Sequence, residues 1–239
     1  MWKFGYDFRH FTPKLHPLAR RKRILEAHQI DCVLDVGAND GSYGLELRDL
    51  NYSGRIVSFE PLTDAFTVLS ARAERDPKWI AEHYALGDKP GEKTINIAKN
   101  SWSSSLLDML PAHTQFAPQS KYIGNEKITV TTLDSVFPRL VQGKHVYLKI
   151  DTQGFEEQVL RGAEKSLVSI DTVQVEMSLI PLYRSQMLFM DMMGLMGDYG
   201  YALVALEPGF CDSKTGHVLQ VDGIFHRANL NGSPSYIRA

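Results

Sequence analysis

The stretch "VLDVGANDGSYG", residues 33–44, decides the fold class of this chain. It begins with an apolar run that is typical of a strand buried on both faces of a sheet, and it continues into three glycines. Gly37, Gly41 and Gly44 are more widely spaced than the glycines of the dinucleotide-binding pattern G-x-G-x-x-G. The stretch therefore predicts a strand, a turn that supplies free N–H groups to a ligand, and a helix.

Further strands and helices alternate on both sides of this stretch, which predicts an α/β fold with a mostly parallel sheet. We expect about seven strands in the sheet, with an antiparallel member among the last ones. The predicted strands are 55–60, 79–86, 93–98, 127–133, 145–151, 172–178, 201–207 and 218–227, and further helices are expected at 15–28, 63–74, with Thr63 as its cap, and 186–199. The long polar stretch 99–126 is a candidate lid, because loops of this length are usually functional.

Length and composition limit the number of domains but do not indicate a binding partner. A chain of 239 residues suits one large domain, and a net charge of -2 favours neither an acidic nor a basic partner. Residues 1–30 nevertheless hold seven Lys and Arg against Asp7 and Glu26. We therefore expect a basic N-terminal arm at 1–30 and a single domain at 31–239; the arm is either a solvated helix face or a contact for a nucleotide sugar or a membrane-linked glycan.

The cysteines and the hydropathy pattern argue against several classes of protein. Cys32 and Cys211 belong to no pattern that holds zinc or forms a redox pair. No apolar run approaches the ~20 residues of a membrane span, and the first residues have no signal-peptide core. These features favour a cytoplasmic protein, with no nucleic-acid partner and with an undetermined oligomeric state.

Two acids beside the glycines indicate the kind of ligand. Asp35 lies inside the first strand just before the turn, where a carboxylate would repel a phosphate. S-adenosylmethionine carries two positive groups, and Glu60, which ends the next strand, is placed to bind its ribose hydroxyls. The position of Glu60 also matches a dinucleotide fold, so an NAD-dependent oxidoreductase is the alternative.

Several motifs in order resemble the FkbM family of S-adenosylmethionine-dependent methyltransferases. The first stretch, "SFEP", "ALGD", "SSSLL", "TLD", "LKIDTQGFEEQVLRGAE", "PLYRSQ", "LEPGF" and "LQVDGIF" carry the likeness from about residue 30 to the end. The resemblance implies a Rossmann-like class I methyltransferase fold with a seven-stranded, mostly parallel sheet flanked by helices. It also implies O-methylation of a hydroxyl on a sugar, a glycoconjugate or a secondary metabolite.

The resemblance also implies a set of cofactor-binding residues. The methionine and ribose part would be lined by Asp35, Gly37, Asn39 and Gly41, while Glu60, followed by Pro61, would bind the ribose hydroxyls. Leu86 would border the adenine, with Asp88 either beside it or in a plain turn. Independently of the resemblance, Ser105 in the long polar stretch is a candidate to hydrogen-bond the cofactor or the sugar, and the alternative is a solvated turn.

Methyl transfer to a hydroxyl benefits from a general base, and two carboxylates are candidates. Asp151 and Glu176 end neighbouring predicted strands, so both are expected at the same rim of the sheet. Glu156 could instead stabilise the start of the helix that follows Gly154. A divalent metal held by Asp151, Glu176 and Asp134 is a second option, which we do not favour because no motif links these residues.

Overall fold

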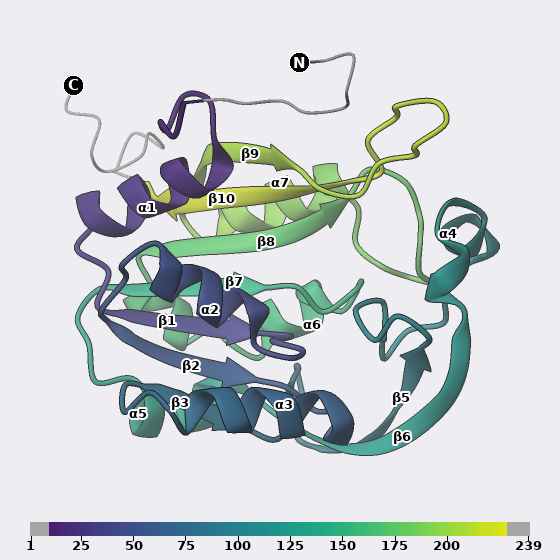
Figure 1. The fold of residues 1–239 in the computed structure, drawn as a ribbon, viewed down its shortest axis with the longest axis horizontal. Helices are drawn as coiled ribbons and strands as arrows, with labels where there is room; N and C mark the ends of the chain where they lie inside the picture. The colour runs from purple at the N-terminus through teal and green to yellow at the C-terminus, as the bar shows by residue number, and fades with distance from the viewer. Residues whose placement is uncertain (1–9, 229–239) are drawn as a thin grey trace.

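The computed structural model describes residues 10–228, and its centre is a seven-stranded sheet with helices on both faces (Figure 1). All neighbouring strands are parallel except the pairs made by β10, which is antiparallel to both β8 and β9. In order across the sheet, the strands are β3 (Trp79–Glu82), β2 (Arg55–Phe59), β1 (Cys32–Val36), β7 (Val146–Ile150), β8 (Thr172–Ser178), β10 (Gln220–Arg227) and β9 (Tyr201–Pro208). The predicted mostly parallel sheet with a late antiparallel member is therefore confirmed.

Strand β1 is the point at which the strand order reverses. It pairs with β2 on one side and with β7 on the other, and Val36 lies opposite both Phe59 and Ile150. The three strands thus end at the same level. Ligands of open α/β sheets bind beyond the carboxyl ends of the strands at such a switch point, so this edge is where a site is expected.

Helices cover the sheet on both faces and bury two apolar clusters. On one face, Leu25, Leu47 and Leu69 pack in one cluster with Val33 of β1. On the other face, the cluster includes residues of the last three α-helices and of β7 and β8. The helices of the first face are α1 (Pro17–Ala27), α2 (Ser42–Asp49) and α3 (Thr63–Ala73), and those of the second are α5 (Leu133–Leu140), α6 (Glu156–Arg161) and α7 (Phe189–Asp198).

A second, three-stranded sheet lies beside the carboxyl ends of the main strands (Figure 1). Its strands, in the order β4 (Ala85–Leu86), β6 (Tyr122–Thr131) and β5 (Gly91–Ala98), include two segments that an alternating pattern predicts as strands, though not in this sheet. The expected strand 79–86 is wrong as a single unit: residues 79–82 pair with β2, whereas Ala85 pairs with Val130. An apolar pattern records burial and not the identity of the pairing strand, so it cannot divide such a run.

The boundaries of some other elements also differ from the expected ones. Thr63 is the first residue of α3 and not its cap; its N–H and hydroxyl both donate to the Glu126 carboxylate of β6. The expected helices 15–28 and 186–199 are shorter at both ends. Three short helical segments complete the chain: α4 (Pro111–Phe116), η2 (Pro118–Ser120) and η3 (Ser166–Ser169).

The N-terminal arm packs on the domain through two of its arginines. Arg21 of α1 is buried and pairs with Glu46 of α2 and Glu207 of β9, and Arg20 also pairs with Glu207. Part of the arm's positive charge is therefore neutralised inside the protein; the remaining expected charges at Lys3, Asp7 and Arg9 lie outside the described residues. Within residues 10–228, none of the helices combines the length and apolar character that a bilayer span requires.

Candidate active site

A cavity opens at the switch point, beyond the carboxyl ends of β1, β2 and β7. It contains about 810 Å³ of empty space, part of it open to solvent. Six of the residues predicted from the sequence line it: Gly37, Asn39, Glu60, Pro61, Leu86 and Asp151. The other five, Asp35, Gly41, Asp88, Ser105 and Glu176, are not among the residues that line it.

The first turn is shaped by a close approach of β1 and β7. Gly37 has a φ of +77°, and a Cβ placed on it would lie 1.9 Å from the Asp151 carbonyl oxygen. Gly41, with a φ of +85°, faces Leu69 and Trp79 in the same way. Glycine is required at both positions because a side chain has no room and the backbone is left-handed. The glycines thus serve the packing of the turn.

The backbone N–H groups of this turn already have protein acceptors. Gly37 and Ala38 both donate to the Phe59 carbonyl oxygen, and Asn39 donates to Glu60 Oε2 at 2.8 Å. The next three N–H groups, those of Asp40, Gly41 and Ser42, bond within the turn. The expectation that the turn offers free N–H groups is therefore wrong, and the turn does not form the cradle of N–H donors that binds a phosphate.

Glu60 holds the turn and still faces the cavity. Its Oε2 accepts the N–H of Asn39 at 2.8 Å, and its Oε1 accepts the N–H of Leu62 at 2.9 Å. Each carboxylate oxygen retains a second lone pair for a ligand hydroxyl. Burial raises the pKa of Glu60 to about 7, although the two backbone N–H groups act in the opposite direction. The carboxylate therefore changes charge near neutral pH.

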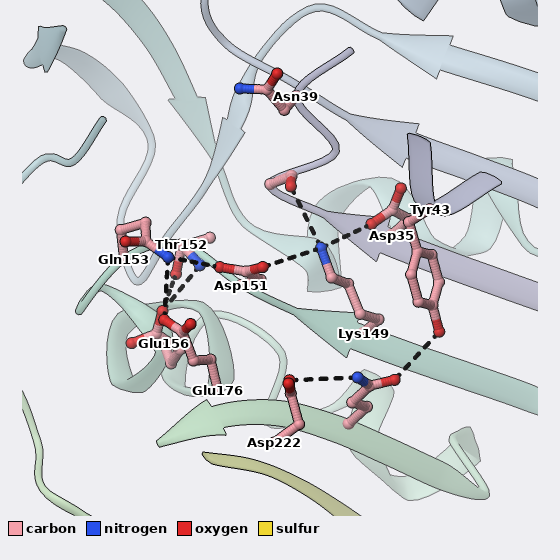
Figure 2. A network of polar contacts seen from close by, with 12 residues as sticks. Asp35, Asn39, Tyr43, Lys149, Asp151, Thr152, Gln153, Glu156, Glu176 and Asp222 are labelled. Carbon is pink, nitrogen blue, oxygen red and sulfur yellow. Dashed lines mark hydrogen bonds and ion pairs between the residues drawn. The ribbon is translucent and has the colours of Figure 1, made fainter. Parts of the chain in front are cut away.

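Asp35 is fully buried, and its positive partner is a lysine of the protein (Figure 2). Asp35 of β1 lies directly opposite Lys149 of β7, and the Lys149 Nζ is 3.2 Å from Asp35 Oδ1. The same Nζ is 3.6 Å from Asp151 Oδ2 and 3.3 Å from the Gly37 carbonyl oxygen. Burial lowers the pKa of Lys149, but the two carboxylates outweigh it and the pKa is raised. Asp35 thus carries no free charge for a ligand.

Sequence reasoning missed Lys149, although a signal was present. A lysine inside the apolar run "VYLKI" is as unusual as Asp35 inside "CVLDV". Two opposite charges at matching places in two buried strands would have indicated a cross-strand pair if the strands had been known to be neighbours.

The two predicted acceptor-side carboxylates are brought together by Gln153, a residue the sequence did not single out (Figure 2). The Gln153 side-chain amide donates to Asp151 Oδ1 at 2.9 Å and to Glu176 Oε2 at 3.1 Å. Gln153 lies in the turn after β7, with a φ of +56°, and Tyr183 donates its hydroxyl proton to the Gln153 side-chain oxygen at 2.8 Å. Asp151 and Glu176 therefore share one rim, as predicted, with an amide between them.

Glu156 has the supporting role that was considered for it. As the first residue of α6, it accepts the N–H groups of Thr152 at 2.8 Å and Gly154 at 3.1 Å. Ser105 supports the same turn from the long polar stretch, because its hydroxyl donates to the Gln153 carbonyl oxygen at 2.7 Å. The predicted cofactor contact of Ser105 is thus replaced by a contact with the Gln153 turn.

The far end of the cavity is apolar and is closed by the long polar stretch. Leu86, Ile95 and Phe155 form its wall, while Asp88 is not among the lining residues. Ser101 and Trp102 of the long stretch also line the cavity, and Asn39 donates its side-chain amide to the Ser101 hydroxyl at 2.7 Å. The stretch therefore contacts the first turn, as a lid would; its mobility stays a prediction.

No metal site is apparent in the part of the chain that the structure describes. Among residues 10–228, no three His, Cys, Asp or Glu side chains are grouped so that they could hold a metal ion. Asp134, the third ligand considered from the sequence, accepts instead the N–H groups of Lys165 and Ser166.

Comparison with known proteins identifies the sequence pattern and the fold. The model of the methyltransferase FkbM domain matches residues 35–203, well over half of the chain. No curated protein sequence matches the chain. The family match spans β1 to β9 and includes every residue that was predicted to belong to the site.

Solved structures resemble the chain at low sequence identity, and the likeness in fold rests on the first of them. Fibrillarin, from its complex with Nop5p, superposes with a TM-score of 0.50 at 14% identity, over 93% of this chain and 86% of that one. Magnesium protoporphyrin IX methyltransferase from Synechocystis PCC 6803, with bound S-adenosylmethionine, has a TM-score of 0.46 and 10% identity, over 95% and 89%. The methyltransferase domain of bacterial Hen1 has a TM-score of 0.45 and 13% identity, over 91% and 100%. The fold is the predicted Rossmann-like methyltransferase fold.

Proposed function

This chain belongs to the FkbM methyltransferase family, and on that premise we propose that it transfers the methyl group of S-adenosylmethionine to a hydroxyl group. The acceptor that we propose is a sugar, a glycoconjugate or a secondary metabolite. The choice of donor rests on the first turn. Its N–H groups already have acceptors within the protein and so form no phosphate cradle, and the acid beside it that faces the cavity is Glu60.

The charges of the cavity support this donor over a dinucleotide. Its charged lining residues are Glu60, Asp151 and Lys149, and the one cation is held by two carboxylates. Such a lining has no free positive group for a pyrophosphate, but it accepts the ammonium and sulfonium of S-adenosylmethionine. Glu60 would bind the ribose hydroxyls, and the wall formed by Leu86 and Phe155 would hold the adenine. The residues present thus fit the donor.

The chemistry divides between the donor and the protein. When bound, S-adenosylmethionine supplies a methyl carbon on a sulfonium; the acceptor oxygen bonds to this carbon, the carbon–sulfur bond breaks with its electron pair on sulfur, and S-adenosylhomocysteine remains. A hydroxyl is un-ionised at neutral pH, so its proton must leave as the new bond forms. We propose that the Asp151 carboxylate, which lines the cavity, receives it, an effect of about 10²–10⁴-fold in rate.

Trp102 supports a ring-shaped acceptor. It lines the cavity from the long polar stretch, and it is 61% exposed. An exposed indole offers an apolar face to a sugar ring while the ring hydroxyls stay hydrated. Within the described residues, the proposed contact of the basic arm with a lipid-linked diphosphate now depends on Lys14 and Lys22, because Arg20, Arg21 and Arg23 have acidic partners within the protein.

The proposal is tested by binding and by transfer. Calorimetry is expected to detect S-adenosylmethionine and S-adenosylhomocysteine but not NAD; binding of NAD alone would overturn the choice of donor. Incubation with methyl-labelled donor and candidate glycans should then label a hydroxyl. Asp151→Asn should reduce transfer by about 10²-fold or more and leave donor affinity nearly intact. Equal turnover in this variant would remove Asp151 from the mechanism.

A further inference from the structure

Four carboxylates lie on the acceptor side of the site (Figure 2). Asp151 follows β7, Glu156 begins α6, Glu176 lies in β8 and Asp222 lies in β10. Of these four, and within residues 10–228, Asp151 alone lies beside a cation, Lys149, which precedes it by two residues. The charge of Asp151 acts on each of the other three, and like charges disfavour one another's ionised forms, so the surroundings of each carboxyl decide how readily it ionises.

The four carboxylates differ in their hydrogen-bond and ion-pair partners. Glu156 is bonded to the N–H groups of its own turn, and Asp222 accepts a side-chain N–H of Gln174 at 3.3 Å. Glu176 accepts side-chain amides from Gln153 at 3.1 Å and from Gln220 at 2.7 Å. Of the four, only Asp151 has an ion pair among the described residues, with Lys149 at 3.6 Å. One carboxylate is thus paired with a charge and three are bonded only to neutral donors.

The surroundings favour the neutral form of the other three acids. Burial raises the pKa of Glu156 to about 7 and that of Asp222 to about 6, and it raises the pKa of Glu176 well above its usual range. The charge of Asp151 adds to the rise in each case. This pattern agrees with the geometry: Asp151 lies beside a cation, whereas burial favours the neutral forms of the other three acids.

The position of Lys149 is itself fixed. Its Nζ lies 3.2 Å from the fully buried Asp35, 3.3 Å from the Gly37 carbonyl oxygen and 5.3 Å from the centre of the Tyr43 ring. The Lys149 side chain is 8% exposed and that of Asp151 is 36% exposed, so water screens the attraction between them only from the Asp151 side. Asp35 thus acts on the acceptor side through Lys149.

We infer that Lys149 is a positioning residue which, anchored by Asp35, makes Asp151 rather than Glu176 the group that accepts the acceptor's proton. The inference rests on the proposed function for the identity of the proton donor, but the selection between the two carboxylates is a property of the protein alone. An opposite charge at this distance favours the ionised form of a carboxyl by about 1–3 pH units. When two carboxyl groups lie in environments that differ in this way, the one beside a cation acts as the base and the other stays a neutral acid.

The selection can be measured without any acceptor. Carbon-13 NMR of protein labelled at the aspartate carboxyls, with Asp151→Asn to assign the signal, gives the titration midpoint of Asp151. Lys149→Met should raise this midpoint by about 1–3 pH units, and Lys149→Arg should restore most of the original value. Lys127→Met, at an exposed lysine of β6, is the matched control and should leave it unchanged. An unchanged midpoint in Lys149→Met would overturn the inference.

Lys149→Met leaves the Asp35 carboxylate buried without its cation, which destabilises the fold, so a second variant is needed. The double variant Asp35→Asn/Lys149→Met removes both charges of the pair and should show the same rise in the Asp151 midpoint. If the midpoint stays where it is in the double variant, the inference fails even if the single variant unfolds. S-adenosylhomocysteine binding by calorimetry, measured in parallel, reports on the donor site separately.

Activity provides the last readout once an acceptor is found. In Lys149→Met the acid limb of the pH–rate profile should move to higher pH by the same amount as the Asp151 midpoint, about 1–3 pH units, and activity on the alkaline side of that limb should be retained. Glu176→Gln should lose less activity than Asp151→Asn; the reverse order would overturn the assignment. Failure of the wild-type protein to methylate any hydroxyl would overturn the proposed function and leave the NMR result standing.

Discussion

At the scale of single residues, the two acids near the first turn have different roles. Asp35 is neutralised by Lys149 and does not line the cavity, whereas Glu60 lines it and forms no ion pair within residues 10–228. The Glu60 carboxylate both fixes the turn and keeps lone pairs for a ligand. The charge that a donor meets at this end of the cavity is therefore that of Glu60.

We predict that donor binding depends on pH through Glu60. Burial raises the pKa of Glu60 to about 7, so the carboxylate, the better acceptor for ribose hydroxyls, forms as pH rises through 7. Affinity for S-adenosylhomocysteine should therefore increase between pH 6 and pH 8. Glu60→Gln should weaken binding about 10- to 100-fold at pH 8 and flatten the pH dependence. Calorimetry measures both effects.

The matched control is Glu74→Gln, at an exposed acid that follows α3. It should bind the donor as the wild type does at every pH. A pH dependence that persists in Glu60→Gln would assign the titration to another group, with Glu156 and Asp222 as the next candidates.

At the scale of elements, the site depends on the contact between the turns that follow β1 and β7. Gly37 and Asp151 meet there, backbone to backbone, and the Asp151 N–H also donates to the Val36 carbonyl oxygen at 3.1 Å. In the proposed mechanism, one turn holds the donor and the other carries the carboxylate that receives the acceptor's proton. A glycine at the contact between the turns would then set the distance between donor and base.

We predict that Gly37→Ala separates these turns. The left-handed backbone alone should lower the free energy of unfolding by about 1–2 kcal/mol, and the clash with the Asp151 carbonyl oxygen should add to this loss. Urea denaturation gives the loss, and calorimetry should show weaker donor binding. Gly124→Ala is the control, because its Cβ would meet nothing within 4 Å. Equal stability of the two variants would contradict the proposed role of Gly37.

At the scale of the whole molecule, α1 is part of the domain and contacts the site indirectly. The Arg21 guanidinium lies 5.0 Å from the centre of the Tyr43 ring, which also lies 5.3 Å from Lys149 Nζ. Tyr43 lines the cavity and donates its hydroxyl proton to Gln174 at 3.2 Å. A helix outside the family match thus packs against a residue of the cavity wall.

We predict that Arg21→Met destabilises the whole domain, whereas Arg23→Met does not. Removing one partner of a buried ion pair costs about 3–5 kcal/mol, and we expect the lower end because Arg20 still pairs with Glu207. Arg23 pairs with Glu26 on the surface, where such pairs contribute about 0–1 kcal/mol. Thermal melting compares the two variants; equal melting temperatures would show that α1 does not contribute to the fold through Arg21.

Much of the main sheet follows from local sequence, and the second sheet does not. The mostly apolar runs of β1 and β7 predict buried strands, because burial on both faces favours apolar residues at nearly every position. Residues 85–86 and parts of β5 and β6 are also predicted as strands, but they pair with one another in a separate sheet. The pattern indicates that a segment is extended, while the choice of partner depends on where distant segments meet.

The fold class, the family, the position of Glu60 beside the first turn, and the shared rim of Asp151 and Glu176 could all be predicted from the amino-acid sequence. Each of these predictions rests on short motifs and on the order of strands and helices along the chain. Only the tertiary structure decided that Asp35 is neutralised by Lys149, that Gln153 joins the two carboxylates, and that Ser105 supports the Gln153 turn. These contacts depend on strand register and on loops far apart in sequence. The electrostatic energy of a charge depends on its neighbours in space, which a local pattern does not specify.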